Sequence, residues 1–125
     1  METSLIRKAT EDTPAIEFHK GNNKFNISGR SLPEDALVFY QPVLKWMSAY
    51  VKDANPDSEL VISLDYFNSS TVKQLLNLLL IFEEITKSGK QAKVIWCYIE
   101  GDDLMEIKGR EFESMVNVPF ELKIC

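Results

Sequence analysis

The segment from Glu59 to Lys87 constrains the fold of this chain most, because a strand pattern is followed without a linker by a helix pattern. Residues 59–67 (ELVISLDYF) are β-rich and mostly apolar, which is typical of an inner strand. Apolar residues then recur at helical spacing from position 72 onward, and Gly89 is placed to end the helix. A strand that leads directly into an amphipathic helix indicates helices packed on a sheet.

A second amphipathic helix is expected over residues 34–53, where apolar side chains again recur at helical spacing. Ser31 and Glu34 match a capping box at its start. Pro42 lies inside the segment and cannot donate a hydrogen bond to the preceding turn, so we expect a kink or a break there.

The rest of the chain predicts further strands and one more helix. Residues 15–19 and 24–29 alternate apolar with polar side chains around a Gly-Asn-Asn turn, which predicts a β-hairpin. A second inner strand is expected over residues 91–99, a third helix from 101 to about 116, and a final strand over 120–124.

These elements predict an α/β fold in a single domain that spans residues 1–125. We expect a mixed β-sheet of about five strands, with an N-terminal β-hairpin and about three helices. Residues 1–13 (METSLIRKATEDT) are polar, and we expect them to be flexible.

Charge and composition exclude several classes of protein. The chain has 14 Lys and Arg against 19 Asp and Glu, a net charge of −5, so it lacks the basic surface of a nucleic-acid-binding protein. Its longest apolar run, residues 75–85, is interrupted by polar and acidic side chains and is too short to span a membrane. Two cysteines are too few for a secreted disulfide framework, and we expect a soluble cytoplasmic protein.

The usual catalytic and metal-binding sets are missing from the sequence. A single histidine, His19, and the two cysteines, Cys97 and Cys125, cannot build a catalytic triad or a zinc site. The glycines are scattered and form no phosphate-binding loop. Acidic pairs such as Glu83 with Glu84 are typical of a solvated helix face. We therefore predict no catalytic residue, no metal and no cofactor.

The most informative position is the strand-to-helix junction, where Asn68, Ser69, Ser70 and Thr71 follow the inner strand. Such residues are preferred helix caps, and capping alone can explain them. They also present three hydroxyl groups where the chain leaves a strand, and phosphorylation there would change the charge of an exposed loop at little cost to the fold. Both interpretations remain open from spacing alone.

Several short segments match one family pattern when they are taken together. They are residues 13–16 (TPAI), 27–36 (ISGRSLPEDA), 39–46 (FYQPVLKW), 64–71 (LDYFNSST), 96–98 (WCY) and 118–120 (VPF). With these segments the chain closely resembles the SiaC family of bacterial regulatory phosphoproteins, whose fold is similar to the STAS domain of anti-anti-sigma factors.

The resemblance implies a non-enzymatic partner switch. A dedicated serine/threonine kinase and a PP2C-type phosphatase would set the phosphorylation state, and the unphosphorylated form would bind and activate a GGDEF-type diguanylate cyclase, thereby raising cyclic di-GMP and promoting biofilm formation. By the family pattern the phosphoacceptor is Ser69, and Ser70 and Thr71 match further hydroxyl positions.

The same resemblance assigns Asp65, Tyr66 and Asn68 to the loop that meets the partners. The chain departs from the STAS pattern D-S-[ST]-G, because Asn68 replaces the aspartate and Thr71 replaces the glycine. Two alternatives remain: a STAS-like domain that senses a small ligand at this loop, and a constitutive interaction scaffold whose serines only cap a helix.

Overall fold

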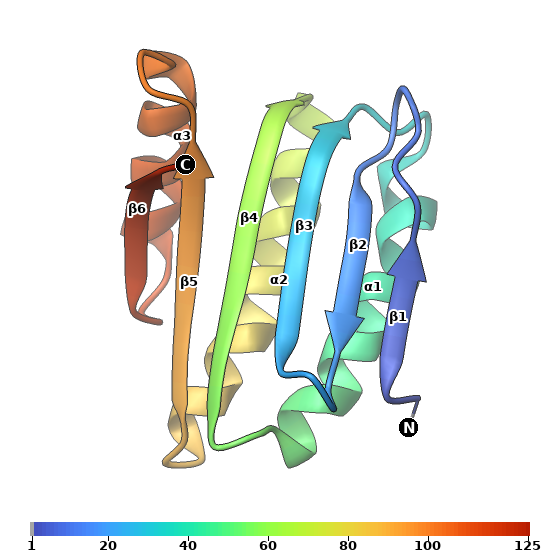
Figure 1. The fold of residues 1–125 in the computed structure, drawn as a ribbon, viewed down its shortest axis with the longest axis vertical. Helices are drawn as coiled ribbons and strands as arrows, with labels where there is room; N and C mark the ends of the chain where they lie inside the picture. The colour runs from blue at the N-terminus through green and yellow to red at the C-terminus, as the bar shows by residue number, and fades with distance from the viewer. Residues whose placement is uncertain (1) are drawn as a thin grey trace.

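A six-stranded mixed sheet forms the framework of the computed structural model, which describes residues 2–125. The strands lie side by side in their sequence order (Figure 1). They are β1 (Ser4–Arg7), β2 (Ala15–His19), β3 (Lys24–Ser31), β4 (Asp57–Phe67), β5 (Gln91–Tyr98) and β6 (Phe120–Ile124). The first three strands pair antiparallel, whereas β3 to β6 pair parallel.

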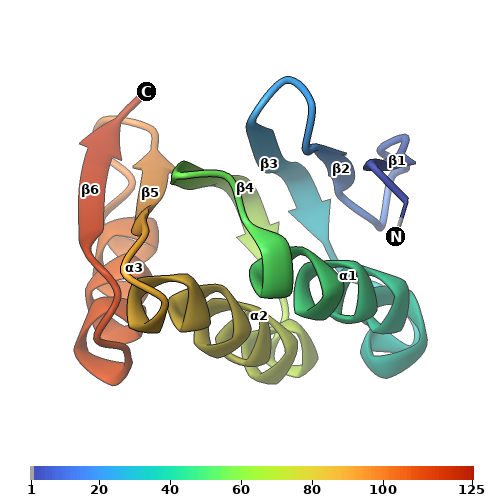
Figure 2. The ribbon, with the colours of Figure 1, turned by 90° about the horizontal axis from the view of Figure 1, so that it is seen from below.

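Three helices cover one face of the sheet, as Figure 2 shows. They are α1 (Ala36–Tyr50), α2 (Ser69–Lys87) and α3 (Asp103–Met115), and a short 3-10 turn (Val51–Asp53) follows α1. Strand side chains on the covered face are almost completely buried: Ile16, Phe18, Phe25, Ile27, Leu60, Ile62, Val94 and Trp96. Because β3, β4 and β5 each lead into a helix, the three helices begin at the same end of the sheet, where these strands finish (Figure 1).

The predicted α/β class, the mixed sheet, the hairpin and the three helices are confirmed. The sheet has six strands rather than five, because Ser4–Arg7 pairs with β2 at the edge. Leu5 lies opposite Phe18 and is buried, which explains why part of a polar segment is ordered. The expected flexibility of residues 1–13 is thus corrected for β1, and residue 1 lies outside the described residues.

The start of α1 differs from the capping box expected at Ser31 and Glu34. Ser31 belongs to β3 and is buried, and Asp35 is the N-cap instead, accepting a hydrogen bond from the Val38 amide at 3.2 Å. Pro42 does not break the helix, which is continuous over Ala36–Tyr50. The carbonyl that Pro42 cannot satisfy belongs to Val38, which is 63% exposed, so water can hydrogen-bond to it.

One pairing in the folded chain was not predicted from the sequence, and one expectation is wrong. Cys97 and Cys125 are paired in a disulfide, because β6 runs parallel to β5 and brings the chain end beside Cys97, with the Cα atoms 5.5 Å apart. Glu83 is not on a solvated face: it is buried, and its Oε1 accepts hydrogen bonds from the backbone amides of Asn117 and Val118. This carboxylate therefore anchors the segment between α3 and β6.

None of the helices within residues 2–125 has the length and apolar character needed to cross a membrane.

The close approach of α3 to β5 depends on a glycine that sequence analysis did not single out. Gly109 lies against the buried indole of Trp96, and a Cβ atom built on Gly109 would lie 2.6 Å from Trp96 Nε1. The same indole N–H donates to the Met105 carbonyl at 3.0 Å, so the ring is held in place from two positions of α3.

We predict that Gly109→Ala lowers the free energy of unfolding by about 1–2 kcal/mol, because the added methyl group overpacks the core against a ring that cannot move. This loss is net of the higher helix propensity of alanine. Urea unfolding measures it. Gly21→Ala is the control, since a Cβ there meets nothing within 4 Å; an equal or smaller loss for Gly109→Ala would contradict the packing argument.

Candidate functional site

A β-bulge at the end of β4 sets the geometry of the predicted junction. Gly29 pairs with Leu64 and Arg30 pairs with Tyr66, so Asp65 is the extra residue on β4. The bulge inverts the alternation of side chains after Leu64. Phe67 consequently points into the core at 5% exposure, whereas Tyr66 is 49% exposed beside the junction. Asp65 and Tyr66, both predicted to meet partners, therefore lie on the surface.

Asn68 begins α2 as its N-cap, which confirms the capping role expected for this segment. Its side-chain Oδ1 accepts hydrogen bonds from the Thr71 amide at 3.1 Å, the Thr71 hydroxyl at 2.8 Å and the Ser70 hydroxyl at 2.9 Å. The backbone N–H of Asn68 donates to the Ser31 carbonyl at 3.1 Å. The end of β4 and the first turn of α2 are thus fixed by one side chain and one backbone bond.

A buried chain of hydroxyl groups lies beneath the junction. Tyr40 OH is 2.7 Å from Ser31 Oγ, which is 2.9 Å from Thr71 Oγ1. Thr71 Oγ1 lies 2.8 Å from Asn68 Oδ1, which can only accept. Tyr40 can therefore donate to Ser31, Ser31 to Thr71 and Thr71 to Asn68. The Thr71 hydroxyl also lies 3.1 Å from the Ser31 carbonyl oxygen, a second acceptor.

Burial raises the pKa of Tyr40 to about 12, and its hydrogen bond with Ser31 opposes this effect. The phenol is consequently protonated near neutral pH and is able to donate. Tyr40 belongs to α1 and Ser31 to β3, so the row connects both elements to the start of α2. Tyr40 and Ser31 were not predicted as parts of the site, because nothing in their spacing places them beside Thr71.

The three candidate phosphoacceptors differ in accessibility. Thr71 is 0% exposed and its hydroxyl is part of the buried row, so a kinase cannot reach it in the folded protein. Ser69 and Ser70 are both exposed at the surface. The Ser70 hydroxyl donates to Asn68, whereas the Ser69 hydroxyl has no hydrogen-bond partner within residues 2–125.

An open hollow of about 500 Å³ lies beside Ser69. Its walls come from the β4–α2 junction and from α3: Tyr66, Phe67, Asn68, Ser69, Val72, Leu104 and Lys108. Lys108 Nζ is 5.8 Å from the centre of the Phe67 ring, a cation–π distance. Leu104 and Lys108 were not identified from sequence, because only folding brings α3 next to α2.

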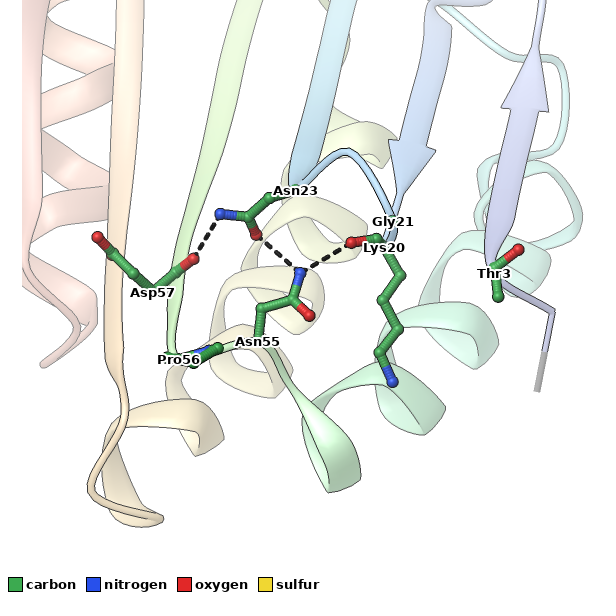
Figure 3. Close-up of a pocket in the computed structure, with 7 residues that line it drawn as sticks. All are labelled: Thr3, Lys20, Gly21, Asn23, Asn55, Pro56 and Asp57. Atoms are coloured by element: carbon green, nitrogen blue, oxygen red, sulfur yellow. Dashed lines mark hydrogen bonds between the residues drawn. The ribbon is translucent and has the colours of Figure 1, made fainter.

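Another hollow lies at the opposite end of the strands, where β4 begins (Figure 3). The Asn55 side chain donates to the Lys20 carbonyl and to Asn23 Oδ1, both at 2.9 Å, and Asn23 donates to the Asp57 carbonyl at 2.7 Å. These amides join neighbouring loops through satisfied hydrogen bonds. The region therefore has a structural explanation, and it does not adjoin the predicted junction.

Within residues 2–125, no three His, Cys, Asp or Glu side chains gather in a group that could hold a metal ion. The polar groups that the junction presents are the exposed hydroxyl groups of Ser69 and Ser70, with the cation of Lys108 on the same hollow as Ser69.

We predict that Thr71→Val destabilises the protein by about 1–3 kcal/mol, because the shape is kept while Ser31 and Asn68 each lose a buried partner. Ser70→Ala, which removes an exposed hydroxyl from the same cap, should cost less than about 0.5 kcal/mol. Urea unfolding at pH 7 compares the two variants. Equal losses would show that the buried row contributes no more than the surface bond.

The raised pKa of Tyr40 predicts a loss of stability at alkaline pH. Between an unfolded value near 10 and a folded value of about 12, the folded chain holds the proton that the unfolded chain has lost. The free energy of unfolding should therefore fall as the pH rises through this range. Unfolding in urea at pH 9 and pH 11.5 should show a fall about 2 kcal/mol smaller for Tyr40→Phe than for the wild type. Parallel falls would contradict the burial argument.

Comparison with known proteins gives structural and sequence relatives. The chain is 25% identical over 114 residues to an uncharacterized protein of Pseudomonas aeruginosa (strain UCBPP-PA14), covering 91% of this chain and 90% of that protein. The fold of this chain matches SiaC of Pseudomonas aeruginosa with a TM-score of 0.87 at 24% identity. The match covers 99% of this chain and 100% of the SiaC chain.

A third match comes from the crystal structure of the diguanylate cyclase SiaD in complex with its activator SiaC, also from Pseudomonas aeruginosa. The TM-score is 0.89 at 25% identity, covering 97% of this chain and 99% of the matched chain. The family model described as SiaC family regulatory phosphoprotein matches residues 7–125, which include the bulge, the Asn68 cap and all three candidate hydroxyl groups. The chain therefore belongs to the SiaC family of regulatory phosphoproteins.

Proposed function

We propose that this protein is a non-enzymatic partner switch that is reversibly phosphorylated on Ser69, and whose unphosphorylated form binds and activates a diguanylate cyclase. The observation that carries the proposal is the exposed Ser69 hydroxyl, which has no hydrogen-bond partner within the described chain and directly follows a rigid helix cap. Membership of a family of regulatory phosphoproteins supports a phosphorylated hydroxyl in this chain.

The choice of Ser69 over its neighbours follows from burial and hydrogen bonding. Phosphorylation of Thr71 would require the buried row to open, because this side chain is fully buried. Phosphorylation of Ser70 would remove the hydrogen bond that its hydroxyl donates to Asn68. A phosphoryl group on Ser69 breaks no hydrogen bond that the structure contains within residues 2–125, so the fold would tolerate it.

The effect on a partner would be local. A phosphoryl group adds about 1.5 to 2 negative charges and three acceptor oxygens beside the exposed ring of Tyr66. A partner surface that fits an uncharged hydroxyl would then face a dianion that has to be desolvated. Phosphorylation should therefore weaken binding without unfolding the domain.

The proposed circuit has three partners and takes place in the cytoplasm, where ATP and GTP are available. A serine/threonine kinase adds the phosphoryl group and a PP2C-type phosphatase removes it. The third partner is a GGDEF-type diguanylate cyclase, as supported by the complex in which the SiaC of Pseudomonas aeruginosa is described as the activator of SiaD. Asp65, Tyr66 and Asn68 would orient the loop toward these proteins.

We predict that a serine/threonine kinase encoded next to this protein, supplied with ATP, adds one phosphate to Ser69, as mapped by mass spectrometry of peptides. Ser69→Asp should weaken binding of the cyclase about tenfold in calorimetry, because it places a negative charge at the contact. The loss should be smaller than that caused by phosphorylation, since one carboxylate carries less charge than a phosphate. Ser69→Ala should bind as the wild type does.

Ser70→Asp is the matched control for this prediction, since it places the same charge one residue further along the exposed cap. If the kinase modifies neither Ser69 nor Ser70, the phosphorylation switch is refuted, and modification of Ser70 alone would refute the proposed role of Ser69. Equal cyclase affinity of Ser69→Asp and Ser69→Ala would favour the constitutive scaffold.

The hollow beside Ser69 also favours a second candidate, a STAS-like domain that senses a small ligand. Native mass spectrometry of the protein purified from cells distinguishes the two functions. A bound metabolite lost in Leu104→Glu, which fills the hollow with a charge, would support ligand sensing over the phosphorylation switch.

A further inference from the structure

We infer that Lys108 of α3 binds the phosphate on Ser69 within the same chain, so that phosphorylation closes the hollow between α2 and α3. The inference rests on the proposed function, because it concerns a phosphoryl group at Ser69. It adds a built-in receptor for that group and explains how modification changes the surface shape as well as its charge.

The hydroxyl of Ser69 and the ammonium of Lys108 belong to two side chains that line the same hollow. Ser69 contributes from the first turn of α2, and Lys108 contributes from the middle of α3. Lys108 Nζ lies 5.8 Å from the centre of the Phe67 ring, which also lines the hollow. A lysine side chain has four methylene groups, so its ammonium can turn toward a phosphate while α3 stays in place.

The charges at the hollow favour this pairing. Among the described residues that line the hollow, Lys108 is the only charged one. Its ammonium forms no ion pair within residues 2–125. Arg110, two residues further along α3, is paired instead with Glu106 at 3.1 Å. Lys108 is also half-buried, so its attraction to a phosphate is screened less by water than that of a fully exposed lysine.

Lys73 is the competing cation. It lies four residues after Ser69 on α2, a spacing at which helix side chains can pair, and it is exposed. Asp65 and Asp103 are exposed acidic residues of β4 and α3 that add negative charge to the same end of the sheet. The half-buried position of Lys108 distinguishes it from Lys73, which is exposed.

Closure would remove an apolar surface. Tyr66 and Leu104 are 49% and 57% exposed, and with Val72 they surround the hollow. A phosphate held by Lys108 would span this opening with two charged groups and their water. An apolar side chain of a partner could then no longer enter, whereas the hollow stays open when Ser69 carries a free hydroxyl.

The experiment uses the full chain with phosphoserine incorporated at position 69 during translation, so no kinase is needed. Phosphorus-31 NMR follows the second ionisation of the phosphate as the pH is varied. A neighbouring ammonium favours the dianion, so Lys108→Gln should raise this pKa by about 0.5 unit. Lys108→Arg, which keeps the positive charge, should restore the lower pKa. Arg110→Gln is the matched control on the same helix and should leave the pKa unchanged.

An unchanged phosphate pKa in Lys108→Gln, in a protein that circular dichroism shows to be folded, would overturn the inference. A larger shift in Lys73→Gln than in Lys108→Gln would overturn it as well and assign the phosphate to α2 alone. Neither result would bear on whether a kinase modifies Ser69. Conversely, a kinase that leaves Ser69 unmodified would refute the proposed function, while the titration of the incorporated phosphoserine would still test Lys108.

Discussion

The buried row of hydroxyl groups from Tyr40 through Ser31 to Thr71 is the interaction on which the site depends. It joins a helix, a central strand and the first turn of a second helix, and it ends on the side chain of Asn68, which caps that helix. A buried polar group without a partner is costly, so these groups hold each other in one arrangement. The result is a rigid base beneath two exposed serines.

The surface above this base is shaped by the bulge at Asp65. By inverting the side-chain alternation, the bulge buries Phe67 and exposes Tyr66 at the point where the chain turns into α2. Phe67 lines the hollow together with Ser69 and Lys108, and its ring lies 5.8 Å from Lys108 Nζ. A small backbone irregularity thus contributes to one hollow that an aromatic ring, a hydroxyl group and a cation all line.

Local patterns predicted most of the elements, because strand alternation, helical spacing and capping residues act over a few positions. The hairpin and the cap at Asn68 are examples. Local patterns failed where contacts with distant segments of the chain decided the structure of a residue. Ser31 looked like a helix cap, but pairing with β4 placed it in a strand and turned its hydroxyl toward Tyr40. Ser4–Arg7 looked too polar to be ordered, but the segment pairs with β2 and Leu5 is buried.

The sequence by itself determined the α/β class and the family, and it predicted the stretch of four residues in which we propose a phosphoacceptor, since these follow from contiguous motifs. Only the tertiary structure separated the hydroxyl groups within that stretch. Thr71 is buried and its hydroxyl is hydrogen-bonded to Ser31, whereas Ser69 is exposed at the surface. It alone also brought Lys108 to the site, because α2 and α3 meet only through packing on the sheet. Accessibility and charge environment depend on contacts between distant segments, which no local pattern encodes.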